Sequence, residues 1–502
     1  MNPISAVVRA NTDFPIPFDN TYARLPESFY QRANPEPVAR PSLLKLNDAL
    51  ARQLRIDPEF LRSPSGIAML SGNAIAPGSE PIALAYAGHQ FGHFVPQLGD
   101  GRAVLLGEVT DHDGKRFDLQ LKGSGQTPFS RRGDGRAAIG PVIREYIVSE
   151  AMAALGIPTT RSLAAVVTGE SVVRERMLPG GVLTRVASSH LRVGTFQYFA
   201  ARGDTASVRR LADYTITRHY PHASEEHQPY RALFDAVVMA LAKLSARWML
   251  VGFIHGVLNT DNTSIAGETI DYGPCAFMDA FDPAKVFSSI DHHGRYAFKN
   301  QPAIIKWNLA RFAETLLPLF GDDDARAVEI ANALLACFDR HYLTTYQSGL
   351  NRKLGLTDVS EGDAALGAEL VATMAVSGAD FTLTFRALSE AAADSSQDGE
   401  IRKLFAESSA FDAWVTRWRA RLGHEPRSLD DIRAGMRAVN PKFIPRNHRI
   451  EAAIRDAEFG EYSRFHELIE VLAKPFDDQP AFAAYAQPPA PEEEVTQTFC
   501  GT

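Results

Sequence analysis

Segment 255–273 contains side chains that could act on a nucleotide phosphate. It begins with His-Gly and has the spacing of a kinase catalytic loop, with Asn262 five residues after Val257, where such a loop places a metal-binding asparagine. The Asp-Tyr-Gly at 271–273 stands where a kinase has Asp-Phe-Gly. Valine occupies the position of the catalytic aspartate. The segment therefore keeps metal-binding residue types and lacks the usual base.

Asn262 and Asp271 offer an amide oxygen and a carboxylate, the hard oxygen ligands that Mg²⁺ or Mn²⁺ prefers. We expect such an ion to bridge phosphate oxygens of a nucleotide. Asp261, four residues after Val257, is the carboxylate that could replace the missing base. An aspartate at this place could also serve only to cap the loop.

Kinase chemistry further needs a strand lysine that holds phosphates and a helix glutamate that holds the lysine. Lys122 lies in the strand-like run DLQLKGSG, and Glu145 follows 23 residues later in a predicted helix. Either residue alone would most simply be a surface charge. Together with the downstream loop pattern, they are interpreted as the phosphate-binding pair.

No Gly-x-Gly-x-x-Gly loop precedes Lys122, but QLGDGRA and SRRGDGRAAIGP combine glycines with arginines. Glycine lets a backbone approach phosphates closely, and arginine forms charge-assisted bonds to their oxygens. Both segments could equally be hairpin turns with solvated arginines. Two further arginines near the end of the strand-rich region could clamp a triphosphate. The candidate nucleotide-binding residues in these segments are Gly99, Gly101, Arg102, Asp134, Gly135, Arg185 and Arg192.

The composition is that of a globular protein without a marked affinity for nucleic acid. Of the 502 residues, 45% are hydrophobic and 22% charged, and the net charge of −8 does not suggest a binder of nucleic acid or acidic membranes. Three cysteines, Cys275, Cys337 and Cys500, are too few for a disulfide framework. No signal-peptide pattern or uninterrupted membrane span is present. We expect a cytoplasmic protein.

Strand patterns precede helical patterns along the chain. Segment 42–54 has a helical pattern, and 162–187 is typical of three short strands joined by glycine-containing turns. Two further strands and four helices are predicted at 102–109 and 117–125, and at 141–156, 234–253, 304–320 and 323–346.

This order predicts an α+β, protein-kinase-like bilobal fold. Its parts would be an N-terminal extension at 1–80, a strand-rich lobe with one key helix at 81–195, a larger helical lobe at 196–480 with the catalytic and metal-binding loops, and a mobile tail at 481–502.

Several long motifs resemble the selenoprotein O family, whose bacterial members are called YdiU. They are YAGHQFGHFVPQLGDGRA, LQLKGSGQTPFSRRGDGRA, HGVLNTDNTSI followed by DYGP, and NPKFIPRNHRIEAAI. The resemblance runs from about residue 15 to the C-terminus. It implies a kinase-like fold and transfer of AMP, or in some members UMP, from the nucleoside triphosphate to hydroxyl side chains of proteins.

The resemblance also implies roles for individual residues. A nucleotide bound in the reversed sense would present its α-phosphate to the acceptor, with Asp261 as proton acceptor and Asn262 and Asp271 as Mg²⁺ or Mn²⁺ ligands. The glycine- and arginine-containing segments would surround the nucleotide together with Lys122, and Glu145 would support that lysine. Cys500 stands where the family often has selenocysteine or cysteine and is a possible redox residue. The partners would be nucleoside triphosphate and protein substrates, with no nucleic acid and no membrane.

Two alternatives stay open: a small-molecule or protein kinase that transfers the γ-phosphate, and an inactive nucleotide-binding pseudokinase. Val257 argues against the first, because such kinases keep the loop aspartate. Intact candidates at the lysine, glutamate and metal positions argue against the second.

Overall fold

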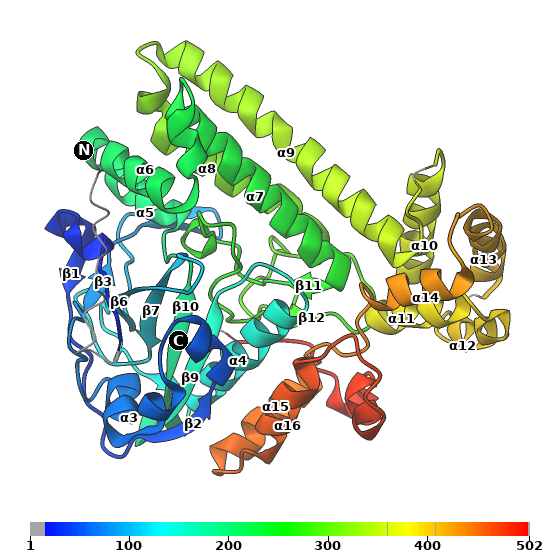
Figure 1. The fold of residues 1–502 in the computed structure, drawn as a ribbon, viewed down its shortest axis with the longest axis horizontal. Helices are drawn as coiled ribbons and strands as arrows, with labels where there is room; N and C mark the ends of the chain where they lie inside the picture. Colours follow the sequence, from blue (N-terminus) through cyan, green and yellow to red (C-terminus); the bar gives the residue numbers. More distant parts are fainter. Residues whose placement is uncertain (1–15, 359, 407, 500–502) are drawn as a thin grey trace, which may run out of the picture. The chain divides into compact units, whose positions relative to one another are not determined.

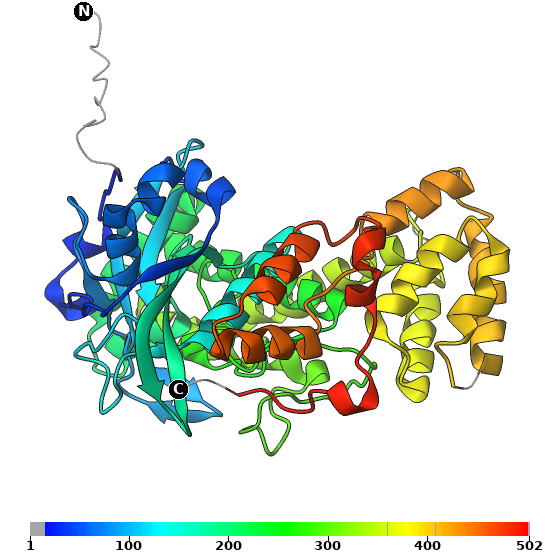
Figure 2. The ribbon, with the colours of Figure 1, turned by 90° about the horizontal axis from the view of Figure 1, so that it is seen from below.

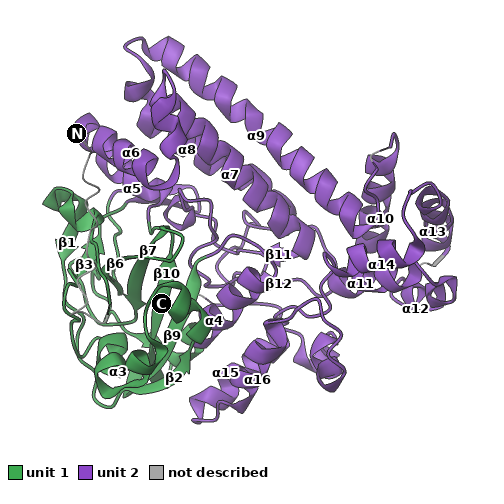
Figure 3. Cartoon of the chain, in the orientation of Figure 1, with its two compact units in different colours: residues 1–86, 97–142, 160–190 green, residues 87–96, 143–159, 191–502 purple. Residues whose placement is uncertain are grey.

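The computed structural model describes residues 16–499 except 359 and 407. Within them, an antiparallel sheet is formed by the N-terminal part of the chain and a helical region follows, which confirms the predicted order of strands and helices (Figure 1). The chain groups into two compact units (Figure 3). Unit 1 comprises 1–86, 97–142 and 160–190, and unit 2 comprises 87–96, 143–159 and 191–502.

Unit 1 is built on a sheet of eight described strands in the order β1-β3-β6-β7-β10-β9-β2, with β8 paired to β10. The strands are β1 (Tyr30–Arg32), β2 (Ser42–Leu46), β3 (Ile82–Leu84), β6 (Ala103–Thr110), β7 (Arg116–Lys122), β8 (Ala137–Ala138), β9 (Arg161–Val173) and β10 (Met177–Ala187). One face is covered by the short helices α1 (Asp48–Gln53), α2 (Pro58–Arg62) and α3 (Pro64–Ser71). Their Leu50, Leu61 and Leu70 pack with Leu121 and Val166 of the sheet in one buried cluster, so burial of apolar surface holds the helices to the sheet.

The prediction of three short strands at 162–187 is wrong, because the segment forms the two long paired strands β9 and β10. The glycines interpreted as turns lie inside strands. Gly169 has φ +72°, and a Cβ there would meet the Arg40 backbone oxygen at 2.8 Å. The β9–β10 register shifts between Pro179 and Gly181. Glycine here accommodates irregular strand geometry and close packing rather than a reversal of the chain.

The helix predicted over 42–54 is also partly wrong, because its first half is strand β2, which pairs with β9. Asn47 separates the two elements. Its side chain accepts a hydrogen bond from Leu50 N at 3.2 Å and so caps α1. Asparagine is a favourable N-cap because its side chain satisfies a backbone N–H that the first helical turn leaves unpaired.

Unit 2 is mainly helical. Three long helices, α7 (Pro229–Val251), α8 (Gln301–Phe320) and α9 (Asp324–Lys353), lie against one another and confirm the helices predicted at 234–253, 304–320 and 323–346. α4 (Ile139–Ala154), whose residues from 143 onward belong to this unit, confirms the helix at 141–156. The other helices are α5 (Val193–Ala200), α6 (Thr205–His219), α10 (Asp363–Ser377), α11 (Phe381–Ala391), α12 (Asp398–Arg402), α13 (Ser408–Leu422), α14 (Leu429–Arg437), α15 (Asn447–Glu458) and α16 (Ser463–Leu472).

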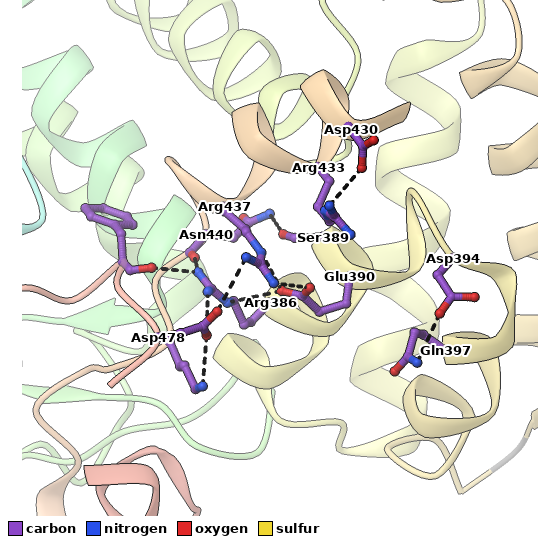
Figure 4. A network of polar contacts seen from close by, with 12 residues as sticks. Arg386, Ser389, Glu390, Asp394, Gln397, Asp430, Arg433, Arg437, Asn440 and Asp478 are labelled. Atoms are coloured by element: carbon purple, nitrogen blue, oxygen red, sulfur yellow. Dashed lines mark hydrogen bonds and ion pairs between the residues drawn. The ribbon is translucent and has the colours of Figure 1, made fainter. Parts of the chain in front are cut away.

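Helices α10 to α14 gather at the C-terminal end of α9 in both views of the chain (Figure 2). A polar network joins α11 and α14 to the segment that follows α16 (Figure 4). Arg386 donates to the Phe476 carbonyl and pairs with Asp478, each at 2.9 Å, and Arg437 donates to Glu390 at 2.8 Å. These contacts hold the segment after α16 against the helical cluster.

None of the helices in the described residues is long and apolar enough to cross a membrane.

Lys353, the last residue of α9, is a charged side chain inside this helical cluster. It is 4% exposed, and its Nζ lies 4.2 Å from the centre of the Phe385 ring. No ion pair of its ammonium with a carboxylate occurs among the described residues. Burial lowers the pKa of Lys353 to about 7 because the apolar surroundings disfavour the charged form.

We expect Lys353→Met to stabilise the protein below pH 7 and to lose this advantage as the pH rises toward 10.5. Below the folded-state pKa, the folded protein buries a charged ammonium, and the loss of its hydration lowers the free energy of unfolding. Between about 7 and 10.5 only the unfolded chain keeps the proton, so wild-type stability rises by up to about 1.4 kcal/mol per pH unit. Denaturant midpoints at pH 6.5 and 9.5 measure this, with the exposed Lys403→Met as control. If Lys353→Met changed the stability equally at both pH values, Lys353 would not have the lowered pKa described above.

Candidate active site

The catalytic-loop segment is anchored by a small ladder in unit 2. Strand β11 (Phe253–Ile254) pairs with β12 (Ala276–Phe277), and the segments with the predicted functional residues run between them. His255 donates from Nε2 to the Ile270 carbonyl at 2.9 Å, and its backbone N–H donates to Gln301 Oε1 at 2.9 Å. The buried histidine therefore ties the loop start to the residue that precedes Asp271.

Val257 contributes its backbone to the loop rather than a reactive side chain. Its carbonyl accepts hydrogen bonds from Asn259 N at 2.8 Å and from Asn262 Nδ2 at 3.0 Å. The valine side chain is buried. Because the amide nitrogen of Asn262 is held by this carbonyl, its Oδ1 is the atom left to bind a cation.

Arg192 joins the loop to the Asp-Tyr-Gly segment. The residue is 2% exposed, and its Nη1 donates to the Asp261 carbonyl at 2.7 Å and to Asp271 Oδ2 at 2.5 Å. Asp271 has φ +60°, a backbone conformation that is strained for a residue with a side chain. The ion pair with Arg192 helps to keep Asp271 in this conformation beside residues 261 and 262.

Asp261 is a buried carboxylate with one oxygen held and one oxygen unused. Gln90 Nε2 donates to its Oδ2 at 3.0 Å, whereas its Oδ1 is buried without a hydrogen-bond partner in the described part of the chain. Burial raises the pKa of the Asp261 carboxyl to about 6, while the Gln90 hydrogen bond and the Arg192 charge oppose the rise. Such a carboxylate is a stronger base than an exposed aspartate and is still mostly ionised at neutral pH.

A hairpin from a distant part of the sequence covers Asp261. Strands β4 (Gly88–Gln90) and β5 (His93–Val95) pair with each other. The hairpin is fixed by hydrogen bonds from His89 N to Thr260 Oγ1 at 2.6 Å and from Phe91 N to Asn259 Oδ1 at 3.2 Å. A Cβ at Gly88 would lie 2.5 Å from Asp261 Oδ1. Only glycine fits there without displacing the carboxylate.

The side chains of Asn262 and Asp271 suit a cation that is also coordinated by phosphate oxygens. Across the described residues, no group of three or more His, Cys, Asp or Glu side chains is arranged to hold a metal ion. Asn262 and Asp271 supply one amide and one carboxylate, and the shared contact of Arg192 sets Asp271 beside the loop. Mg²⁺ commonly takes one or two protein ligands and completes its shell with phosphate oxygens and water. The two residues fit such an ion.

Seven predicted nucleotide-binding residues lie in unit 1. Buried hydrogen bonds connect the strand that carries Arg185 to the segment that contains Gly99 and Gly101. Arg185 on β10 donates from Nε to Gln120 Oε1 at 3.1 Å, and Gln120 Nε2 donates to Asp100 Oδ2 at 2.9 Å. Asp100 lies between Gly99 and Gly101. A Cβ at Gly101 would lie 2.9 Å from the Phe129 carbonyl oxygen, so its small size also serves packing.

The remaining unit 1 candidates lie at strand ends and turns. Lys122 ends β7, in register with Ala103 of β6, and the backbone carbonyl of Arg102 accepts from Gly123 N at 2.7 Å. Gly135 accepts from Gly125 N at 3.1 Å.

Asp134 forms an ion pair with Arg174 at 2.7 Å, and that hydrogen bond lowers the pKa of its carboxyl. Glu145 lies on α4 in unit 2. The structure thus assembles Arg192, Asp261, Asn262 and Asp271 in unit 2, while the glycine- and arginine-containing segments form a second group in unit 1.

Comparison with known proteins gives a consistent result. A family model described as "Protein adenylyltransferase SelO" matches residues 14–473. Two proteins named "Protein nucleotidyltransferase YdiU" are 71% identical: that of Nitrobacter winogradskyi over 498 residues, 99% of each chain, and that of Nitrobacter hamburgensis over 492 residues, 98% of this chain and 97% of that one. A protein of the same name from Bradyrhizobium sp. strain BTAi1 is 63% identical over 487 residues, 97% of this chain and 99% of that one.

This chain belongs to the SelO family. The resemblance seen in the sequence motifs is therefore confirmed over nearly the full chain. Cys500, for which a redox role is predicted, lies outside the described residues.

Sequence reasoning missed Gln90 and Gly88, the residues that hold and accommodate the Asp261 carboxylate. They lie in the HQFGH-containing motif, about 170 positions before Asp261. The motif itself was a signal, because it combines glycines with polar side chains. Its contact with the loop could not be read from local periodicity.

We predict that Gly88→Ala lowers turnover at least about tenfold, because the new methyl group must displace the carboxylate, and tenfold corresponds to only ~1.4 kcal/mol in the barrier. Gly399→Ala is the matched control, since a Cβ there meets nothing within 4 Å. Steady-state kinetics with ATP and thermal unfolding of both variants measure the effect. Full turnover of folded Gly88→Ala would show that Asp261 need not stay in the observed position.

Proposed function

We propose that this protein transfers AMP from ATP, or UMP from UTP, to Ser, Thr or Tyr hydroxyls of proteins, with release of pyrophosphate. The observation that carries the proposal is the buried Asp261 carboxylate beside Asn262, with valine at the position of the kinase base. The names of the SelO family model and of the YdiU relatives support nucleotidyl transfer to proteins.

In the proposed reaction, Asp261 accepts the proton of the acceptor hydroxyl. The hydroxyl oxygen forms a bond to the α-phosphorus, and the bond from that phosphorus to the oxygen bridging to the β-phosphate breaks. Pyrophosphate leaves with the electron pair. The hydrogen bond from Gln90 to Oδ2 leaves Oδ1 as the oxygen to receive the proton.

The remaining residues bind and orient the nucleotide. Arg185, Arg192 and Lys122 would neutralise phosphate charge, with Glu145 supporting the lysine. The glycine-containing segments would approach the phosphates through backbone N–H groups, and the set from these segments is Gly99, Gly101, Arg102, Asp134 and Gly135. A reversed nucleotide would bring its α-phosphate to Asp261.

Asn262 and Asp271 would hold Mg²⁺ or Mn²⁺, which would neutralise negative charge on the phosphates when bound. Two observations support this: Arg192 links Asp271 to the backbone of Asp261, the residue before Asn262, and the Val257 carbonyl holds the amide nitrogen of Asn262.

The wider setting of the reaction is also part of the proposal. We propose a kinase-like arrangement of a strand-rich lobe at 81–195 and a helical lobe at 196–480, between an extension at 1–80 and a tail at 481–502. The sheet of unit 1 and the helices of unit 2 support it. The proposed location is the cytoplasm, with protein substrates and nucleoside triphosphate as partners.

Two ATP samples, labelled at the α- or the γ-phosphate, test the proposal with Mg²⁺ or Mn²⁺ and a cell extract. We expect label in protein only from the α-position, with pyrophosphate as product. Label only from the γ-position would mean phosphoryl transfer. If the protein binds ATP but neither label enters protein, with extracts from several growth conditions, the result would favour the pseudokinase.

Asp261→Asn should reduce α-label transfer by at least about a hundredfold, the lower end of the range for loss of a catalytic base. Asp271→Ala should abolish metal-dependent transfer, because it removes the proposed carboxylate ligand of the cation. Val257→Ala should keep most of it, because the loop uses only the valine backbone for polar contacts. Labelled protein after a fixed time, with thermal unfolding of each variant, measures this. Unchanged transfer in Asp271→Ala would make the metal-site assignment wrong.

A further inference from the structure

Two arginines lie close to the ring of one tryptophan beside the hairpin that holds Asp261. The guanidinium carbons of Arg295 and Arg311 lie 4.8 and 4.9 Å from the centre of the Trp307 ring. The His89 ring packs against the same tryptophan in a T-shaped arrangement, with ring centres 5.2 Å apart. We name Arg295, Trp307 and Arg311 the basic stack. Stacking on an indole orients a guanidinium while its N–H edge stays able to bind an anion.

The basic stack borders the proposed catalytic base. A Cβ at Gly92, in the tip of the β4–β5 hairpin, would lie 3.7 Å from the guanidinium carbon of Arg295. The neighbouring Phe91 N donates to Tyr296 Oη at 3.1 Å, and Gln90 donates to Asp261. One short hairpin therefore contacts both the arginine and the carboxylate. A ligand bound by Arg295 would lie close to the group that would accept a proton from the acceptor hydroxyl.

Arg295 lacks a carboxylate partner of its own within the described residues. The nearby Asp291 uses both carboxylate oxygens on backbone N–H groups, those of Arg295 at 2.9 Å and Tyr296 at 2.8 Å. Arg311 pairs with Glu314 at 2.6 Å. The Nε of Arg295 is buried without a hydrogen-bond partner in the described part of the chain. The guanidinium of Arg295 is thus oriented by stacking, but its charge is not neutralised by an ion pair.

The local charge contrasts with that of the whole chain. The protein carries a net charge of −8, which would repel an acidic partner in general. At this border, by contrast, the described residues give Arg295 no carboxylate partner, so its positive charge stays available to an acidic group. Burial lowers the pKa of His89, and the positive charges of Arg311 and Arg295 add to this effect, which favours the neutral ring at physiological pH.

We propose that the basic stack binds an acidic segment of the acceptor protein next to the hydroxyl that receives the nucleotide. The proposal rests on the proposed protein nucleotidyl transfer and adds a substrate class to it. Arginine clusters recognise acidic peptides through charge-assisted hydrogen bonds. Charge complementarity at the edge of the site would select the acceptor among many exposed hydroxyls and speed its association.

The test measures binding first, independently of transfer. A fluorescent peptide with one Ser flanked by Glu residues is compared with its Gln counterpart by anisotropy. Wild type should bind the Glu peptide about tenfold more tightly, the effect of roughly one charge-assisted hydrogen bond, and added salt should reduce the difference. Arg295→Gln should abolish the preference, while Arg295→Lys should keep part of it.

Arg340→Gln, an exposed arginine on α9, is the matched control and should bind as wild type. Equal binding of both peptides by wild type, or equal losses in Arg295→Gln and Arg340→Gln, would overturn the proposal. Thermal unfolding shows whether Arg295→Gln stays folded, and Arg311→Gln provides a second variant of the stack.

A second readout separates this proposal from the proposed function. The Glu peptide should inhibit labelling of extract proteins from α-labelled ATP by wild type, and the Gln peptide should not. Selective binding without any α-label in protein would leave the docking surface intact and contradict nucleotidyl transfer. α-Label that the Glu peptide does not reduce would support transfer and contradict the docking surface.

Discussion

The contact of Arg192 with two loops is the constraint on which the candidate site depends. A buried guanidinium is costly unless every charged and polar neighbour is well placed. Here one nitrogen of Arg192 donates both to the Asp261 carbonyl and to the Asp271 carboxylate. Displacement of either loop would leave a buried cation with incomplete hydrogen bonding. This coupling keeps Asp271 in its left-handed conformation and fixes the backbone that carries Asp261 and Asn262.

The side chain of Asp261 needs separate support, and the β4–β5 hairpin supplies it. Gln90 holds one carboxylate oxygen, and the absence of a side chain at Gly88 makes room for the other. Burial then raises the pKa of the carboxyl, while Gln90 and Arg192 limit the rise to a value of about 6. The backbone and the side chain of the same residue are thus positioned by different parts of the sequence. The carboxylate that we propose as the base is therefore held in place four residues after the usual kinase position.

Local signals in the sequence predicted much of this, and long-range contacts account for the rest. The long helices predicted from their periodicity are confirmed, whereas the cation-binding role that spacing gives to Asn262 and Asp271 stays a prediction. The error at 162–187 arose because glycine marks both turns and irregular strands, and only pairing with β2 and β10 distinguishes them. The contacts of Gln90 with Asp261 and of Gly92 with Arg295 join residues about 170 and 200 positions apart. No local pattern encodes such contacts.

The most direct measurement is a crystal structure of the protein with Mn²⁺ and a non-hydrolysable ATP analogue. We expect the α-phosphorus to be the phosphorus nearest the Asp261 carboxylate, with the cation on Asn262 and Asp271. A γ-phosphate nearest Asp261 would contradict nucleotidyl transfer by this site. A cation bound away from Asn262 and Asp271 would contradict the arrangement that Arg192 maintains.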